Sequence, residues 1–199
     1  DIAYLLAVPN FTVTAPKDGR EMLALLRSAV EHTGGGPWSL RYPRDASPDD
    51  PPPMKDIERV PYGTWEVLRR GHNVAILAVG TMVLPSVAAA DLLKRDGLDV
   101  TVVNCRYLKP FDEVTLTAVL ANHQRILVVE EGTVVNGFGA FMSSVIERQD
   151  MPVRVHTHGV PDRIIAAAPR ARQLHDCGLT PEGIAERVRA MLESEALTG

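Results

Sequence analysis

The chain of 199 residues has little cysteine, few aromatic side chains and no excess of positive charge. Its two cysteines, Cys105 and Cys177, are too few for a disulfide framework and predict a reducing compartment, the cytoplasm. Cys105 lies in an apolar run, where an inert core thiol is expected rather than a nucleophile. The net charge of −4 argues against a general role at nucleic acid or anionic membranes. No apolar run reaches the roughly 18 residues that a membrane span needs, and no signal peptide is visible.

The common catalytic motifs are also missing. The chain contains no G-x-S-x-G, H-E-x-x-H or CxxC pattern, and neither a P-loop nor the dinucleotide fingerprint G-x-G-x-x-G. Hydrophobic residues make up 45% and charged residues 23%, which is typical of a globular protein. The opening "DIAYLLAVPNFTV" has no methionine and no capping or turn sequence before it. We therefore expect the chain to be a piece of a longer protein.

Three parts differ in composition. Residues 1–45 predict a short helical turn, a strand, a helix and a strand, with Asp18 as N-cap and Glu21 completing a capping box. Residues 46–62 are rich in proline and poor in large apolar groups, and they predict a linker or surface crossover. Residues 63–199 alternate between strand-like and helix-like segments, which predicts an α/β fold with a mostly parallel sheet flanked by helices.

The segments expected in the third part follow from their periodicity. The predicted strands are 73–80, 99–108, 125–132 and 153–160. The predicted helices are 84–96, 111–123, 137–149 and 180–196, the last with Thr180 as N-cap and Pro181 at the first helical position.

The stretch "RYPRD" places Arg41 and Arg44 where the second predicted strand ends. The planar arginine fork matches phosphate or carboxylate oxygens, and the carboxyl edge of a parallel sheet is the usual ligand crevice. The alternative is a surface ion pair with Asp45 or Asp49, which would stabilise the fold little. Spacing alone leaves both interpretations open.

The stretch "EEGTVVNGFGA" (130–140) carries three glycines between a strand and a helix. It could cradle a phosphate at the helix N-terminus, but a tight strand-to-helix turn is the simpler interpretation. Glu130 and Glu131 end a buried strand and point to opposite faces, so we expect a structural or interface role rather than paired acid–base work.

Histidines are the remaining candidates. His156 and His158 share one face of a predicted strand, and with His175, Asp176 or Cys177 they could form a metal site. No spacing among them is diagnostic, and ordinary surface or interface histidines are the favoured interpretation. The sequence therefore assigns no metal ligand and no catalytic residue within this chain.

Several ordered stretches together resemble one family. They are "DIAYLLAVPNFTVTAPKDGREMLALLRSAV", "GPWSLRYPRD", "VVNCRYLKPFDE", "ILVVEEGTVVNGFGA" and "GVPDRII". In this order they resemble the C-terminal third of the 1-deoxy-D-xylulose 5-phosphate synthases, thiamine-diphosphate enzymes of the transketolase superfamily. "RYPR" favours these synthases over transketolases and over the beta subunits of 2-oxo-acid dehydrogenases, which share the "KP-D" and "EEG" segments.

The resemblance implies an architecture and an activity. Residues 1–45 would be the end of a pyrimidine-binding-type domain, and 63–199 a complete transketolase C-terminal domain that supports a homodimer. The enzymes are transferases that join pyruvate, with loss of CO2, to glyceraldehyde 3-phosphate, for isoprenoid and thiamine precursor synthesis. By resemblance Arg44 binds the glyceraldehyde 3-phosphate phosphate group. Arg41 is a weaker candidate for the same role, or a structural partner.

Departures from the family set limits on this chain. The GDG…N segment that holds thiamine diphosphate and Mg2+ is absent, as are the activating glutamate and the histidine and aspartate near the acceptor. The chain alone is therefore expected to be inactive and to need the missing N-terminal part. "RIIAAAPRARQLHDCG" (163–178) departs from the family where a His-Gly pair is usual, which leaves the roles of His175 and Asp176 open.

Three alternatives remain at this point. The chain could be a beta-type subunit of a 2-oxo-acid dehydrogenase, a subunit of a split transketolase, or a non-catalytic dimerisation or regulatory module. The hydrophobic side chains around the glycine turn are equally reasonable as interface or as core. They are Val134, Val135, Phe138 and Phe141.

Overall fold

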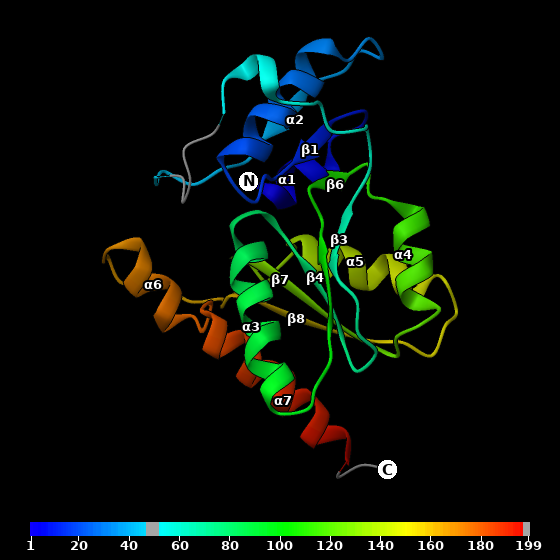
Figure 1. Cartoon of the computed structure of the whole chain (residues 1–199), viewed down its shortest axis with the longest axis vertical. Helices are drawn as coiled ribbons and strands as arrows, with labels where there is room; N and C mark the ends of the chain where they lie inside the picture. The colour runs from blue at the N-terminus through cyan, green and yellow to red at the C-terminus, as the bar shows by residue number, and fades with distance from the viewer. Residues whose placement is uncertain (47–51, 197–199) are drawn as a thin grey trace.

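The computed structural model describes residues 1–46 and 52–196, whose strands form two sheets (Figure 1). The strands are β1 (Thr12–Thr14), β2 (Trp38–Leu40), β3 (Glu66–Arg69), β4 (Ala75–Ala78), β5 (Thr101–Asn104), β6 (Tyr107–Lys109), β7 (Arg125–Thr133) and β8 (Arg154–Val160). The helices are α1 (Ile2–Ala7), α2 (Gly19–Glu31), α3 (Val83–Arg95), α4 (Glu113–Leu120), α5 (Phe138–Glu147), α6 (Arg170–Asp176) and α7 (Pro181–Ala196). Two single turns of 3-10 helix, η1 (Met54–Asp56) and η2 (Gly80–Met82), complete the described elements.

The larger sheet has five strands in the order β3-β5-β4-β7-β8. Strands β5, β4, β7 and β8 run parallel to one another, and β3 is antiparallel to β5 at one edge. All four residues of β4 are buried, as expected for a parallel strand covered on both faces. The prediction of a mostly parallel sheet is confirmed, with one antiparallel edge strand that makes the sheet mixed.

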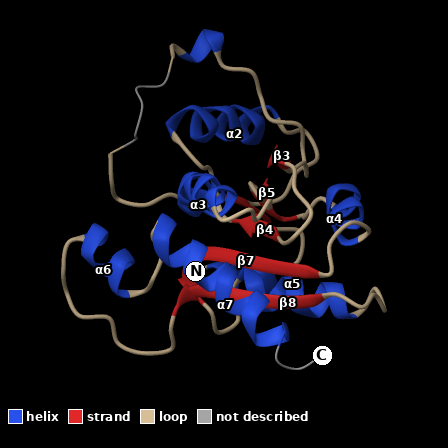
Figure 2. Ribbon diagram, turned by 60° about the horizontal axis from the view of Figure 1, so that its bottom comes forward, coloured by secondary structure: helices blue, strands red, loops and turns tan. Residues whose placement is uncertain are grey.

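Helices cover both faces of this sheet (Figure 2). Side chains of β4 alternate between the two layers because successive residues of a strand point to opposite faces. Ala75 and Leu77 belong to the hydrophobic cluster that includes α4 and α5. Ile76 and Ala78 belong to the cluster that includes α3 and α7. The helices that the sequence predicted between and after the strands therefore form the two outer layers.

The smaller sheet has the order β2-β1-β6 and joins the first 45 residues to the rest of the chain. Strand β1 is parallel to β2 and antiparallel to β6, with Val13 opposite Lys109 and Thr14 opposite Tyr107. All three residues of β1 are buried. Residues 1–45 thus share a sheet with a strand from the following part, and β1 lies between β2 and β6.

The strand predicted over 99–108 is wrong as a single element, because the chain changes sheets within it. Cys105 N still donates to Ala78 O (2.9 Å) in the larger sheet. Arg106 O already accepts from Ala15 N (3.0 Å) in the smaller sheet. The predicted strand is therefore two strands, β5 and β6. The short elements β3 and α6 were not predicted.

The proline-rich segment is only in part a surface crossover. Ile57 and Val60 are 1% and 7% exposed and join the core under α2. Their carbonyl oxygens accept from Arg27 Nη1 (2.7 Å) and Ser28 Oγ (2.8 Å). The expectation that this segment stays outside the core is wrong at these two positions. Residues 47–51 lie outside the described part, and the domain bounds 1–45, 46–62 and 63–199 stay a prediction.

Helix caps follow the sequence closely. Asp18 accepts from Glu21 N (2.7 Å) at the start of α2. The Glu21 carboxylate accepts a hydrogen bond from Lys17 N (2.7 Å). In a capping box the donor would be the N–H of the N-cap residue itself, which is one position later. Thr180 Oγ1 accepts from Gly183 N (3.2 Å) at the start of α7. Within the described residues, none of the helices has the length and apolar character to cross a membrane.

Candidate functional site

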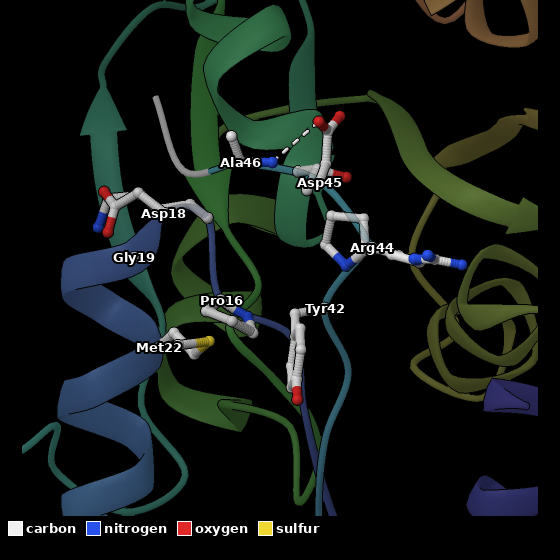
Figure 3. A pocket seen from close by; sticks show the side chains of 11 residues that line it. Pro16, Asp18, Gly19, Met22, Tyr42, Arg44, Asp45 and Ala46 are labelled. Atoms are coloured by element: carbon white, nitrogen blue, oxygen red, sulfur yellow. Dashed lines mark hydrogen bonds between the residues drawn. The ribbon is translucent and has the colours of Figure 1, made fainter. Parts of the chain in front are cut away.

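The segment after β2 positions both predicted arginines. Arg41 N donates to Thr14 O (2.8 Å), which extends the pairing of β1 and β2 by one residue. Pro43 then fixes the backbone before Arg44. Figure 3 shows this segment beside the start of α2. Between them lies a pocket of about 360 Å³, lined by Pro16, Lys17, Asp18, Gly19, Met22, Tyr42, Pro43, Arg44, Asp45, Ala46 and Thr81.

Arg44 is exposed and has no hydrogen bond or ion pair with any residue that the structure describes. Its side chain extends away from Pro16 and Met22 (Figure 3). The alternative partner Asp49 lies outside the described residues. The other alternative, Asp45, is bound to Arg170 instead. Within the described part of the chain, the guanidinium group of Arg44 is thus unpaired, and its substrate role stays a prediction.

Arg41 is held within the protein. Its Nε donates to the Asp1 carboxylate (3.1 and 3.0 Å), and its Nη2 donates to Glu131 O (2.7 Å). Burial lowers the pKa of Arg41 from its ordinary value, although the carboxylates of Glu131 and Glu130 oppose this shift. These contacts match the structural role that was the alternative for Arg41.

Arg41, Arg170, Asp45 and Glu131 form one cluster of charged side chains. Arg170 was not among the residues predicted from the sequence. Its Nη1 donates to Asp45 Oδ2 (2.8 Å), while Nε (2.8 Å) and Nη2 both donate to the Glu131 carboxylate. Thr81 Oγ1 also donates to Glu131 Oε2 (2.6 Å). No local pattern could reveal this contact, because Arg170 and Asp45 are 125 positions apart.

The charge of Glu131 is stabilised by these donors. Burial raises the pKa of Glu131, but the hydrogen bonds from Arg170 and Thr81 and the nearby cationic charges outweigh it, so the net pKa is lowered. A carboxyl group with a lowered pKa in the folded state adds stability above its unfolded pKa, and that contribution is lost as the pH falls through the folded pKa.

We therefore expect Glu131→Gln to lower the free energy of unfolding by an amount that depends on pH. The variant should be less stable than the wild type by about 1 kcal/mol at pH 6, and the difference should shrink as the pH falls from 5 to 3. Urea denaturation of both proteins across this range measures it. If the difference in stability between the two proteins stays constant or grows toward pH 3, the charge of Glu131 does not stabilise the fold.

The glycine-rich turn already has an anion of its own. Glu130 is 1% exposed, and its carboxylate accepts from Phe138 N (3.0 Å) and Gly139 N (2.8 Å) at the start of α5. Burial raises the pKa of Glu130, although both backbone donors and Arg41 oppose this. The phosphate-cradle interpretation is wrong for this turn, because a buried side chain takes the place of the phosphate.

Close packing at this turn explains one glycine. A Cβ added at Gly139 would lie 2.6 Å from Cγ2 of Thr157 on β8. We expect Gly139→Ala to lower the free energy of unfolding by about 2 kcal/mol. Adding Thr157→Ala should recover part of that loss, since it removes the clashing methyl group; a simple additive loss in the double variant would contradict this explanation. Urea denaturation of the two single variants and the double variant measures the coupling.

Phe138 on α5 is buried, whereas Val135 is 45% exposed. Of the four hydrophobic side chains around the turn, Phe138 thus belongs to the core. Phe141 packs against the same cluster while partly exposed. The exposure of Val135 does not fit the core interpretation, and for Val134 the interface and core interpretations both stay predictions.

The candidate metal ligands are not brought together. Within the described ranges, no group of three or more His, Cys, Asp or Glu side chains is placed to hold an ion. His158 Nε2 bonds with Gly178 O (2.8 Å), and burial lowers the pKa of His158. His175 contacts its neighbour Asp176 at the surface (3.5 Å). Cys105 is fully buried, which raises the pKa of its thiol well above the ordinary value and agrees with an inert core residue.

Comparison with known proteins gives a consistent set of matches. The family model for the transketolase C-terminal domain matches residues 63–184. Over the whole chain, the sequence is 38% identical to the 1-deoxy-D-xylulose-5-phosphate synthase of Synechococcus sp. (strain JA-2-3B'a(2-13)), of which it covers 31%. It is 37% identical to the synthase of Gloeobacter violaceus, again with all of this chain and 31% of the relative covered. The chain thus spans about a third of the length of these relatives.

Solved structures give the same fold. A split-gene transketolase, described as an inactive beta4 tetramer, matches with a TM-score of 0.80 and 27% identity over 95% of this chain and 60% of its own chain. A transketolase from Pichia stipitis in complex with sedoheptulose 7-phosphate matches with a TM-score of 0.69 and 24% identity over 94% of this chain and 26% of its own. The second match supports the fold alone.

Proposed function

Because the chain belongs to the transketolase C-terminal domain family, we propose that it is the C-terminal part of a 1-deoxy-D-xylulose 5-phosphate synthase. The proposed reaction joins pyruvate, with loss of CO2, to glyceraldehyde 3-phosphate. The relatives that match over the whole chain support this choice, as does "RYPR" at the end of β2.

The observation that carries the proposal is the state of Arg44. Arg44 follows the carboxyl end of the parallel strand β2 by four residues, and it is exposed and without a partner among the described residues. A planar, permanently charged fork is suited to a phosphate group. In the proposal Arg44 binds the phosphate of glyceraldehyde 3-phosphate, while Arg41 secures the base of the segment through Asp1 and Glu131.

The residues of this chain do not fit thiamine diphosphate and Mg2+. The described part offers no group of carboxylates for the ion, and Glu130 fills the glycine-rich turn that could have held a diphosphate. In the proposal the cofactor and the metal are bound by the N-terminal part of the enzyme. This chain would contribute the phosphate contact and a C-terminal domain that supports a homodimer.

Activity assays of two proteins test the proposal. The full-length protein that carries this chain should form 1-deoxy-D-xylulose 5-phosphate when supplied with thiamine diphosphate, Mg2+ and both substrates. The isolated chain of 199 residues should form none under the same conditions. Product formation by the isolated chain would contradict the assignment of the cofactor site to another part of the enzyme.

A second candidate is a subunit of a split transketolase. It is favoured by the match to the split-gene transketolase, which covers more of the matched chain than the other transketolase match does. Isolation of the native protein distinguishes the two. Recovery of this chain with a separate polypeptide that binds thiamine diphosphate would favour the split enzyme, and a single long polypeptide would favour the synthase.

A further inference from the structure

Both ends of the segment from Arg41 to Asp45 are tied to one residue of the larger sheet. At the first end, Arg41 Nη2 donates to the backbone oxygen of Glu131 (2.7 Å). At the other end, Asp45 is bridged by Arg170 to the Glu131 carboxylate. Arg44 lies between these two anchors.

All three guanidinium nitrogens of Arg170 donate hydrogen bonds in this bridge. Its Nε and Nη2 donate to the two oxygens of Glu131, and its Nη1 donates to Asp45 Oδ2 (2.8 Å). Its side chain is 30% exposed and that of Glu131 is 20% exposed, so the pair is partly withdrawn from solvent. A bidentate pair of this kind fixes the orientation of the guanidinium group as well as its position.

The important partner is Asp45, which directly follows Arg44 in the chain. Its side chain is 48% exposed, and Ala46 N also donates to its Oδ1 (2.9 Å). A free carboxylate at this position would compete with an anionic ligand for Arg44, and its charge would repel a phosphate group. Arg170 engages this carboxylate, and Arg44 has no partner among the residues that the structure describes.

We propose that Arg170 is a positioning residue for phosphate binding, which neutralises Asp45 and thereby keeps the Arg44 guanidinium free for the ligand. The inference rests on the proposed function, because it presumes that Arg44 contacts a phosphate group. It gives a role to Arg170, which lies within the segment 163–178. No atom of Arg170 needs to contact the substrate.

Steady-state kinetics of the full-length protein that carries this chain test the proposal. Arg170→Ala should raise the KM for glyceraldehyde 3-phosphate about three- to tenfold, because it frees the Asp45 charge. The KM for pyruvate and kcat should change by less than about twofold. Arg172→Ala is the matched control, since Arg172 lies on the same short helix and pairs with Asp176 at the surface.

The double variant Arg170→Ala/Asp45→Asn separates this role from simple structural support. Removing the Asp45 charge should return the KM for glyceraldehyde 3-phosphate to within about twofold of the wild type. A double variant as impaired as Arg170→Ala would overturn the inference. If Arg170→Ala does not fold, Arg170→Lys and Arg170→Lys/Asp45→Asn make the same comparison with a smaller expected effect.

Arg44→Ala, measured in the same series, separates the two hypotheses. If it raises the KM for glyceraldehyde 3-phosphate but Arg170→Ala does not, the role of Arg170 is overturned and the proposed function stands. If Arg44→Ala leaves this KM unchanged, the proposed phosphate contact fails and the role of Arg170 fails with it.

Discussion

Replacing Glu21 by alanine is expected to lower the free energy of unfolding by about 3 kcal/mol, since it leaves buried partners without their acceptor. Glu21 is 4% exposed and lies where the first 45 residues meet the rest of the chain. Its carboxylate accepts from Lys17 N (2.7 Å), Lys17 Nζ (3.1 Å) and Asn104 Nδ2 (2.8 Å). Arg106 Nη1 lies 3.6 Å from the same carboxylate. Denaturation by urea measures the loss.

Glu31→Ala is the matched control on the same helix. Glu31 pairs with Arg27 at i,i+4, and the two side chains are 40% and 38% exposed. Exposed pairs of this kind contribute little, so a loss of at most about 0.5 kcal/mol is expected. Equal losses from Glu21→Ala and Glu31→Ala would show that the buried network does not stabilise the junction between the two sheets.

Replacing Arg44 by alanine in the full-length protein is expected to raise the KM for glyceraldehyde 3-phosphate about 10- to 150-fold. This factor corresponds to the loss of about 1.5–3 kcal/mol from one hydrogen bond to a charged group. The KM for pyruvate should change far less, because pyruvate carries no phosphate group. Steady-state kinetics with each substrate varied in turn measure both constants.

Arg44→Lys serves as the control for charge. Lysine keeps the positive charge but loses the planar fork, so its effect should lie between those of wild type and Arg44→Ala. Equal increases in both KM values after Arg44→Ala would contradict the assignment, because they would indicate a general disturbance of the site rather than a lost phosphate contact.

The parallel sheet could be predicted from the sequence because strand-like segments, such as the apolar run of residues 73–80, alternate with segments of helical periodicity. The boundary between β5 and β6 could not, because "DVTVVNCRYL" continues without a glycine, proline or charge cluster at the point where the chain changes sheets. Only the backbone partners of Cys105 and Arg106 reveal that change. The burial of Ile57 and Val60 could not be predicted either, because the prolines around them are typical of a linker.

The candidate site was predictable in part. The position of Arg41 and Arg44 at a strand end could be predicted from the alternation of "WSLRYP" and the proline that follows. Their different surroundings could not be, since Arg41 contacts Glu131 across 90 positions of the chain. The bridge made by Arg170 and the position of the Glu130 carboxylate in the glycine-rich turn could not be predicted from the sequence either.

The choice of donor substrate by the full-length protein tests the central claim most directly. The full-length protein would be incubated with thiamine diphosphate, Mg2+ and glyceraldehyde 3-phosphate, and with either pyruvate or a ketose phosphate as donor. We predict release of CO2 and formation of 1-deoxy-D-xylulose 5-phosphate when pyruvate is the donor, and no product when the ketose phosphate is the donor. Transfer of a two-carbon unit from the ketose phosphate, without turnover of pyruvate, would contradict this prediction and identify a transketolase instead.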